Sequence, residues 1–279
     1  MSKKKVAIQG VKGCFHDSAA HLFFGENDLE IVPCDSFQEL FRKVQSDSSM
    51  AGIVAIENTI AGSLLANYEL MRKSGLRIVG EHKLRIKQSI CAMPGQSLDE
   101  LEEVLSHPIA LMQCGEFIDK HKNLRAIEFD DTANAAKTIA EKHIMKAGAI
   151  CGTYAAHLYG LEVLQEGIET NKHNFTRFLI LDHDDKLMNG KEKNKSTVSF
   201  TVPHSPGALS KILTIISFYD INLTKIQSMP IIGKEWEYLF YVDLTYDDYA
   251  RYLQALEAFR PLTSSLQVLG DYAEGEQTI

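Results

Sequence analysis

The segment NKHNFTRFLILDHDD, residues 171–185, decides how this chain is organised. Thr176 and Arg177 come directly before the apolar run 178–181, which predicts a buried strand. That run ends in residues 182–196, which are almost wholly polar and charged, as in an exposed linker. We therefore expect one domain to close with this strand and a second domain to follow the linker.

Upstream of the segment, strand patterns alternate with helical patterns. Residues 51–58, AGIVAIEN, form a continuous apolar run, as expected for a strand covered on both faces of a parallel sheet. The alternation predicts an open, mostly parallel α/β architecture in two lobes. Such sheets bind ligands beyond the carboxyl ends of their strands, where GVKGCFHD (10–17) and ENTIAGS (57–63) both fall.

After the linker, the order of the predicted strands and helices changes. Strand and helix patterns follow in the order βαββαβ, which is the ferredoxin-like unit. Its first predicted helix has apolar positions spaced to share one face, namely Leu209, Ile212, Leu213 and Ile216. The pattern alone therefore predicts an α/β body followed by a small α+β domain.

Composition excludes several classes of protein. The net charge of −8 argues against a nucleic-acid partner, and no apolar run is long enough to span a membrane. The first residues carry lysines without the apolar region of a signal peptide. Five cysteines without a CxxC pair, and scattered histidines, favour a reduced cytoplasmic protein without a metal site.

Six short motifs then resemble those of prephenate dehydratases, in family order. They are GxxGxF at Gly10 to Phe15, IENTxxGS at Ile56 to Ser63, HPxALxQC at His107 to Cys114, DTAxAA at Asp131 to Ala136, AAxLYGL at Ala155 to Leu161, and NxTRF at Asn174 to Phe178. The C-terminal part, which has PGAL at 206–209, resembles an ACT domain, the regulatory module of that family.

The resemblance implies a body like type 2 periplasmic binding proteins, with substrate in the cleft between two lobes. We expect the catalytic domain at 1–182, with lobes formed by roughly 1–80 plus 170–182 and by 81–169. A linker is expected at 183–196 and an ACT domain at 197–279. The implied reaction is the cofactor-free conversion of prephenate to phenylpyruvate, carbon dioxide and water, a carbon–oxygen lyase step of phenylalanine biosynthesis.

The resemblance also implies the residues of the site. Thr176 matches the family's catalytic hydroxyl, which would assist departure of the substrate hydroxyl, an effect typically worth about 10²- to 10⁴-fold. The expected catalytic residues are Thr176, Arg177, Asn58 and Gln113. The expected substrate-binding residues are Gly13, Phe15, Thr59, Ser63, Thr132 and Phe178.

Arg177 is the one guanidinium within these motifs. The ring carboxylate must lose its charge as it becomes carbon dioxide, so a tight ion pair there would slow the reaction. We therefore expect Arg177 to bind the pyruvyl carboxylate. Neighbours in a strand point to opposite faces, so Thr176 and Arg177 can meet one ligand only at the very start of the strand.

The chain departs from the family pattern at three places. The first loop has Cys14 and His16-Asp17 where hydroxyls are usual, and Ile109 replaces an amide. In the C-terminal domain, QSMP at 227–230 replaces the usual ESRP, which weakens the case for feedback binding of phenylalanine. The loop positions for that effector still match, at Gly207, Ala208, Leu209, Asn222, Leu223 and Thr224.

Two alternatives remain open at this stage. Arogenate dehydratase acts on a substrate with an amino group in place of the keto oxygen, and a non-catalytic amino-acid sensor would share the architecture. Because ACT units pair their sheets side by side, we expect a homodimer or homotetramer. The expected partners are prephenate and, as effector, L-phenylalanine.

Overall fold

The computed structural model describes residues 3–25, 29–188, 190, 192–231, 233–234 and 237–278. By its internal contacts the chain forms two compact units. The first comprises residues 1–64, 82–178 and 277–279, and the second comprises residues 65–81 and 179–276. Among the described residues, no helix has the length and apolar character needed to cross a membrane.

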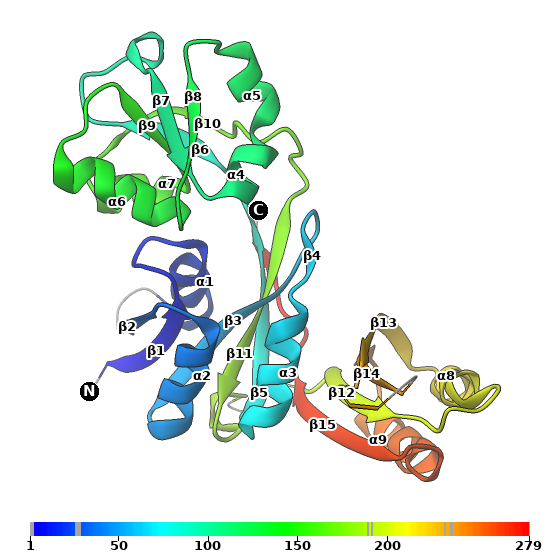
Figure 1. The fold of residues 1–279 in the computed structure, drawn as a ribbon. Coiled ribbons are helices and arrows are strands. Elements are labelled where there is room, and N and C mark those ends of the chain that lie inside the picture. Colours follow the sequence, from blue (N-terminus) through cyan, green and yellow to red (C-terminus); the bar gives the residue numbers. More distant parts are fainter. Residues whose placement is uncertain are drawn as a thin grey trace. The chain divides into compact units, whose positions relative to one another are not determined.

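The first lobe of the first unit is built on a seven-stranded sheet with the order β16-β5-β11-β3-β1-β2, and β4 pairs with β3 (Figure 1). The beginning of β5, up to Glu81, and the end of β11, from Leu179, belong to the second unit. The strands are β1 (Lys4–Gln9), β2 (Leu29–Cys34), β3 (Met50–Asn58), β4 (Gly62–Ser63), β5 (Arg77–Arg85), β11 (Phe175–Asp182) and β16 (Gln277–Thr278).

Strand β3 confirms the expectation for a strand covered on both faces. Its first seven residues are buried, and it runs parallel to β1. Helices α1 (Phe15–Phe24) and α2 (Phe37–Ser46) pack on these strands. Ser36 caps α2 by accepting a hydrogen bond from the Glu39 backbone N–H at 3.2 Å.

The second lobe has a five-stranded sheet with the order β10-β6-β9-β7-β8 (Figure 1). The strands are β6 (Ser89–Ala92), β7 (Glu103–Ser106), β8 (Arg125–Glu128), β9 (Ala147–Cys151) and β10 (Glu162–Glu166). The helices are α4 (Pro108–Gln113), α5 (Gly115–Lys120), α6 (Thr132–Lys142) and α7 (Thr153–Leu158). The chain enters this lobe after β5 and returns to the first lobe along β11.

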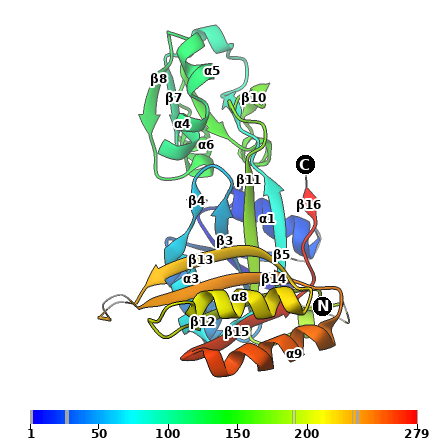
Figure 2. The same cartoon turned by 90° about the vertical axis from the view of Figure 1, so that its right-hand side faces the viewer.

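The second unit contains the expected ferredoxin-like fold, in addition to α3 (Leu65–Ser74). Its sheet has the order β13-β14-β12-β15, and Figure 2 shows α8 and α9 on one face of it. The elements are β12 (Lys195–Thr201), α8 (Ala208–Phe218), β13 (Asn222–Pro230), β14 (Tyr238–Thr245), α9 (Tyr249–Phe259) and β15 (Ser265–Tyr272). Ile212 and Ile216 of α8 are buried in its core, with Leu209 and Leu213 packed against them.

Two contacts within this unit join the ferredoxin-like sheet to β5. The Lys195 ammonium lies 2.8 Å from Glu81 Oε1, and both side chains are almost fully buried. Gly270 of β15 passes so close to β5 that a Cβ atom there would lie 2.2 Å from the Ile78 carbonyl oxygen. Only glycine fits at this crossing.

Replacing Gly270 by alanine therefore tests the crossing. The added methyl group must push β15 away from β5, and such overpacking typically costs about 1–3 kcal/mol. We expect Gly270→Ala to lower the free energy of unfolding by that amount in denaturant titration. Gly115→Ala is the matched control: nothing lies within 4 Å of its Cβ position in helix α5, so we expect equal or higher stability. Equal stability of the two variants would contradict the contact.

Candidate functional site

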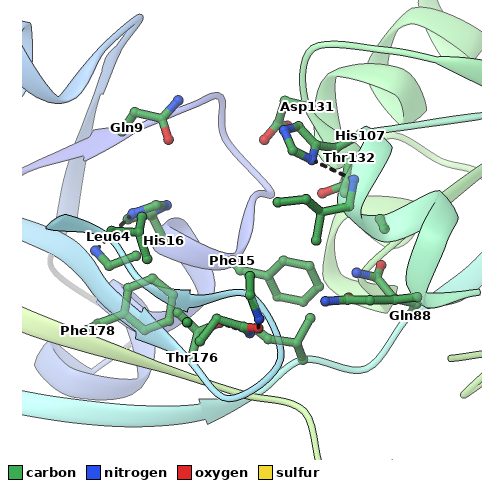
Figure 3. A pocket seen from close by; sticks show the side chains of 18 of the residues that line it. Gln9, Phe15, His16, Leu64, Gln88, His107, Asp131, Thr132, Thr176 and Phe178 are labelled. Atoms are coloured by element: carbon green, nitrogen blue, oxygen red, sulfur yellow. Dashed lines mark hydrogen bonds between the residues drawn. The ribbon is translucent and has the colours of Figure 1, made fainter. Parts of the chain in front are cut away.

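A cavity of ≈ 400 Å³ lies in the first unit, with walls from both lobes (Figure 3). The first lobe contributes residues from β1, α1, β3 and β11. The second contributes Gln88, the N-terminal ends of α4 and α6, and Gln113 at the end of α4. This volume falls in the range of pockets that enclose a small organic ligand.

Seven of the ten catalytic and substrate-binding residues predicted from the sequence line this cavity. They come from five separate motifs, and the fold brings them together. They are Phe15, Asn58, Ser63, Gln113, Thr132, Thr176 and Phe178.

The other three predicted residues lie outside the lining. Gly13 is buried and donates its N–H to Asp17 Oδ2 at 2.7 Å. Thr59 holds the start of β11, because its Oγ1 accepts a hydrogen bond from the Phe175 N–H at 2.9 Å. Arg177 is buried, and the cavity wall is formed by its strand neighbours at alternate positions, Thr176 and Phe178.

The hydroxyl of Thr176 is held by an amide. Asn58 Nδ2 donates to Thr176 Oγ1 at 3.0 Å, so the threonine oxygen acts as an acceptor in this contact. A hydroxyl has one hydrogen and two lone pairs, and this contact uses a lone pair. The hydroxyl hydrogen of Thr176 therefore stays available for a group in the cavity.

Asn58 is itself fixed in orientation. Its Oδ1 accepts the backbone N–H groups of Ile60 and Ala61 at 3.0 and 2.8 Å, which identifies the oxygen and nitrogen ends of the amide. Its Nδ2 also donates to Asn174 Oδ1 at 2.7 Å. Asn174, which is fully buried, donates in turn to Gln113 Oε1 at 3.0 Å. Three amides in series thus connect α4 of the second lobe to the hydroxyl of Thr176.

His16 occupies the cavity wall as a neutral ring. It packs between Phe37 and Phe178, at centroid distances of 5.6 and 5.0 Å, and burial lowers its pKa to about 4. Its Nε2 accepts the Ala55 N–H at 3.2 Å. In the neutral tautomer that this bond requires, Nδ1 carries the proton, so His16 has one N–H donor.

The second lobe presents His107, Asp131 and Thr132 close together (Figure 3). His107 caps α4, with Nδ1 accepting the Ile109 N–H at 3.2 Å. Asp131 caps α6, with Oδ1 accepting the N–H groups of Ala133 and Asn134. Burial raises the pKa of Asp131, and these two N–H bonds and the nearby His107 oppose that shift.

Among the described residues of this lining, the charged side chains are those of Asp130 and Asp131. Cys114, in the HPxALxQC motif, is fully buried, and burial raises the pKa of its thiol to about 12, which suits a packing residue rather than a nucleophile. The other hydrogen-bonding side chains described on this wall are neutral amides, hydroxyls and the imidazole rings of His16 and His107.

Asn174 and Gln88 are two polar residues of this site that the sequence-based prediction did not include. Asn174 is the first residue of the NxTRF motif, and this motif position could have identified it as a site residue. Gln88 lies in the long extended stretch 76–93, outside every motif. Its place on the cavity wall follows from the path of the chain between the lobes, which no local pattern reveals.

The predicted effector residues lie at both ends of α8: Gly207, Ala208 and Leu209 at its start, and Asn222, Leu223 and Thr224 beyond its C-terminal end, where β13 begins. Asn222 and Leu223 line a hollow of ≈ 560 Å³ beside α8. Gly207 precedes α8 with a φ of 76°, a conformation that favours glycine, and Ala208 and Leu209 begin that helix. Thr224 donates its hydroxyl to the Asp243 carbonyl oxygen at 3.2 Å. Of these six residues, only Asn222 and Leu223 line the hollow.

Known proteins resemble this chain over nearly its whole length. It is 36% identical to arogenate dehydratase 2 of Petunia hybrida, with 97% of this chain and 72% of the relative covered. It is 35% identical to the bifunctional chorismate mutase/prephenate dehydratase of Aquifex aeolicus, with coverages of 97% and 74%.

A solved structure shares the whole fold. The prephenate dehydratase of Arthrobacter aurescens in complex with L-Phe superposes with a TM-score of 0.87 at 27% identity, covering 99% of this chain and 92% of that one. The family model described as prephenate dehydratase matches residues 6–186, which contain the cavity and the amide series. The chain therefore belongs to the prephenate dehydratase family.

Proposed function

We propose that the protein catalyses the decarboxylating dehydration of prephenate to phenylpyruvate in the cavity that Thr176 lines. The carbon–oxygen bond of the ring hydroxyl breaks, and the hydroxyl takes up a proton from the surrounding water and leaves as water. The bond to the ring carboxylate breaks, and its electron pair completes the aromatic ring as carbon dioxide departs. The departing hydroxyl takes one electron pair and the carboxylate leaves one pair behind in the ring, so the reaction balances without a redox partner.

The observation that carries this proposal is the oriented hydroxyl of Thr176. Because Asn58 donates to its oxygen, the hydroxyl hydrogen can point at the leaving hydroxyl. A hydrogen bond accepted by Oγ1 also polarises the O–H bond and makes it a better donor. Thr176 therefore hydrogen-bonds the departing group, and Asn58, Asn174 and Gln113 hold it in place.

Neutral donors bind the substrate carboxylates in this proposal. Ser63, Thr132 and the Gln113 amide lie on the wall, and neutral hydrogen bonds hold a carboxylate more weakly than an ion pair does. Weak binding suits the ring carboxylate, which must give up its charge. Binding of the pyruvyl carboxylate by Arg177 stays a prediction, and it requires the side chain to reach the cavity from the other face of β11.

Replacing Thr176 by valine keeps the shape of the side chain and removes the donor. We expect kcat/KM for prephenate to fall by about 10²- to 10⁴-fold, because assistance to the leaving group is lost. Formation of phenylpyruvate is the readout. The control is Thr214→Val, which removes an exposed hydroxyl that bonds to Ser210 O within α8. Full activity of Thr176→Val would refute the assigned role, and an inactive wild-type protein would favour the non-catalytic sensor.

His16 acts in this proposal as a neutral N–H donor that replaces a family hydroxyl. Its ring should therefore stay unprotonated from pH 8 to pH 5, because its pKa lies at about 4. The unfolded chain binds this proton near pH 6.5, so the contribution of His16 to stability is complete above that pH and is lost towards pH 4. Histidine ring shifts in NMR spectra test this, with exposed His157 as the internal reference. Protonation of His16 near neutral pH would contradict it.

Arogenate is the second candidate substrate. The charged residues described on the cavity wall are Asp130 and Asp131, which favour a substrate that carries an ammonium group. The 36% identical relative from Petunia hybrida is named an arogenate dehydratase. Turnover of both substrates, measured side by side, separates the two activities.

We further propose that residues 197–279 form an ACT domain that binds L-phenylalanine, in a cytoplasmic homodimer or homotetramer. The similar structure from Arthrobacter aurescens is a complex with L-Phe, and this chain retains Gly207 and Asn222 at the matching loops.

Titration with L-phenylalanine tests this regulation. We expect inhibition of prephenate turnover, and we expect Asn222→Ala to raise the half-inhibitory concentration by about 5-fold, as for the loss of one neutral hydrogen bond. Activity without phenylalanine should not change, because Asn222 lies in the other unit. L-Alanine serves as the control ligand. A flat response of the wild-type protein would remove the regulatory proposal.

A further inference from the structure

Gln88 is a cavity residue to which neither the motifs nor the mechanism assigns a role. Its side chain is 2% exposed and lines the cavity. Its Oε1 is buried and meets no hydrogen-bond donor among the described residues. A buried acceptor without a partner is destabilising, and proteins seldom retain one unless a ligand or water completes it.

The backbone of Gln88 is fixed on both sides. Its N–H donates to Glu169 Oε2 at 2.9 Å, and its carbonyl oxygen accepts the Ile168 N–H at 2.9 Å. Figure 3 shows its side chain reaching into the cavity towards Phe15. The amide is thus anchored in the wall and directed at the space that a ligand would fill.

Gln88 and Thr176 lie apart on the cavity wall, with Phe15 between them in Figure 3. The Ile86 N–H donates to the Asn174 carbonyl oxygen at 2.8 Å, which places these two residues side by side. The chain enters the second lobe through Ile86 and leaves it through Asn174, so the two segments run in opposite directions. Gln88 is two residues beyond Ile86, and Thr176 is two residues beyond Asn174 in the opposite direction, so at most roughly 13 Å of extended chain separates them.

The substrate also has two chemically distinct ends. Its leaving hydroxyl and its three-carbon side chain sit at opposite ends of the six-membered ring. With the hydroxyl at Thr176, the side chain extends towards Gln88. In this placement its carboxylate lies away from Arg177, so the contact predicted for Arg177 and the contact with Gln88 are alternatives. The group that differs between prephenate and arogenate, a keto oxygen or an ammonium, is carried by that side chain.

We propose that Gln88 is a specificity-determining residue that contacts this group. The inference rests on the proposed function. A carboxamide can present its oxygen to an ammonium, or, after rotation by about half a turn, its NH₂ to a keto oxygen. Gln88 therefore accepts both substrates, and its unpartnered oxygen favours the ammonium of arogenate.

The experiment measures kcat/KM for arogenate and prephenate in the wild type, Gln88→Glu and Gln88→Met, at pH 8. A carboxylate can accept from the ammonium but cannot donate to the keto oxygen. We expect Gln88→Glu to raise the arogenate-to-prephenate ratio by about 10-fold or more, the size of one hydrogen bond to a charged group. The side chain in Gln88→Met can neither accept a hydrogen bond from the ammonium nor donate one to the keto oxygen. We therefore expect kcat/KM to fall for both substrates, with a rise in KM rather than a loss of kcat.

Gln96→Glu is the matched control. Gln96 is a buried glutamine of the same lobe, outside the cavity, whose Oε1 accepts the Lys146 N–H. This variant should leave the ratio unchanged, and thermal unfolding verifies that each variant is folded. Active Gln88 variants with the wild-type ratio and KM values would overturn the inference and leave the proposed function standing. A shift of equal size in Gln96→Glu would also overturn it. A wild type that turns over neither substrate would overturn both proposals.

Discussion

The hydrogen bond from Asn58 to Thr176 is the interaction on which the site depends. A threonine hydroxyl rotates freely and is a weak acid, so it assists a leaving group only when its hydrogen is aimed. Here the Asn58 amide occupies a lone pair of the threonine oxygen, and two backbone N–H groups fix the amide in turn. Asn174 and Gln113 extend the series into the second lobe. The residues are neutral throughout, so their orientation does not depend on pH.

Much of the cavity wall is also uncharged. Burial keeps the His16 ring uncharged, and the carboxylates of Asp130 and Asp131 are the charges described along the lining. A reaction that destroys a carboxylate gains little from a strong cation beside it, because the cation would stabilise the starting charge. Amides and hydroxyls bind a carboxylate less tightly, and they leave room for a substrate with either a keto oxygen or an ammonium.

The second unit shows how a small domain can be attached to a long strand. Gly270 brings the backbone of β15 against β5, and the buried pair of Lys195 and Glu81 fixes the neighbouring position. A buried ion pair of this kind contributes little net stability, yet removing one partner leaves an unpaired charge and is strongly destabilising. Both contacts hold together backbone segments that lie far apart in the sequence.

Local patterns in the sequence determined the fold class. The apolar run of β3 and the βαββαβ order are short-range signals, and the structure confirms both. Motif positions likewise identified most of the residues that line the cavity. Tertiary structure decided which side of β11 faces that cavity, and hence that Thr176 lines it while Arg177 does not. It alone revealed the link through Asn174 and the place of Gln88, because both arise from contacts between segments remote in sequence, and a pattern of neighbouring residues carries no information about such contacts.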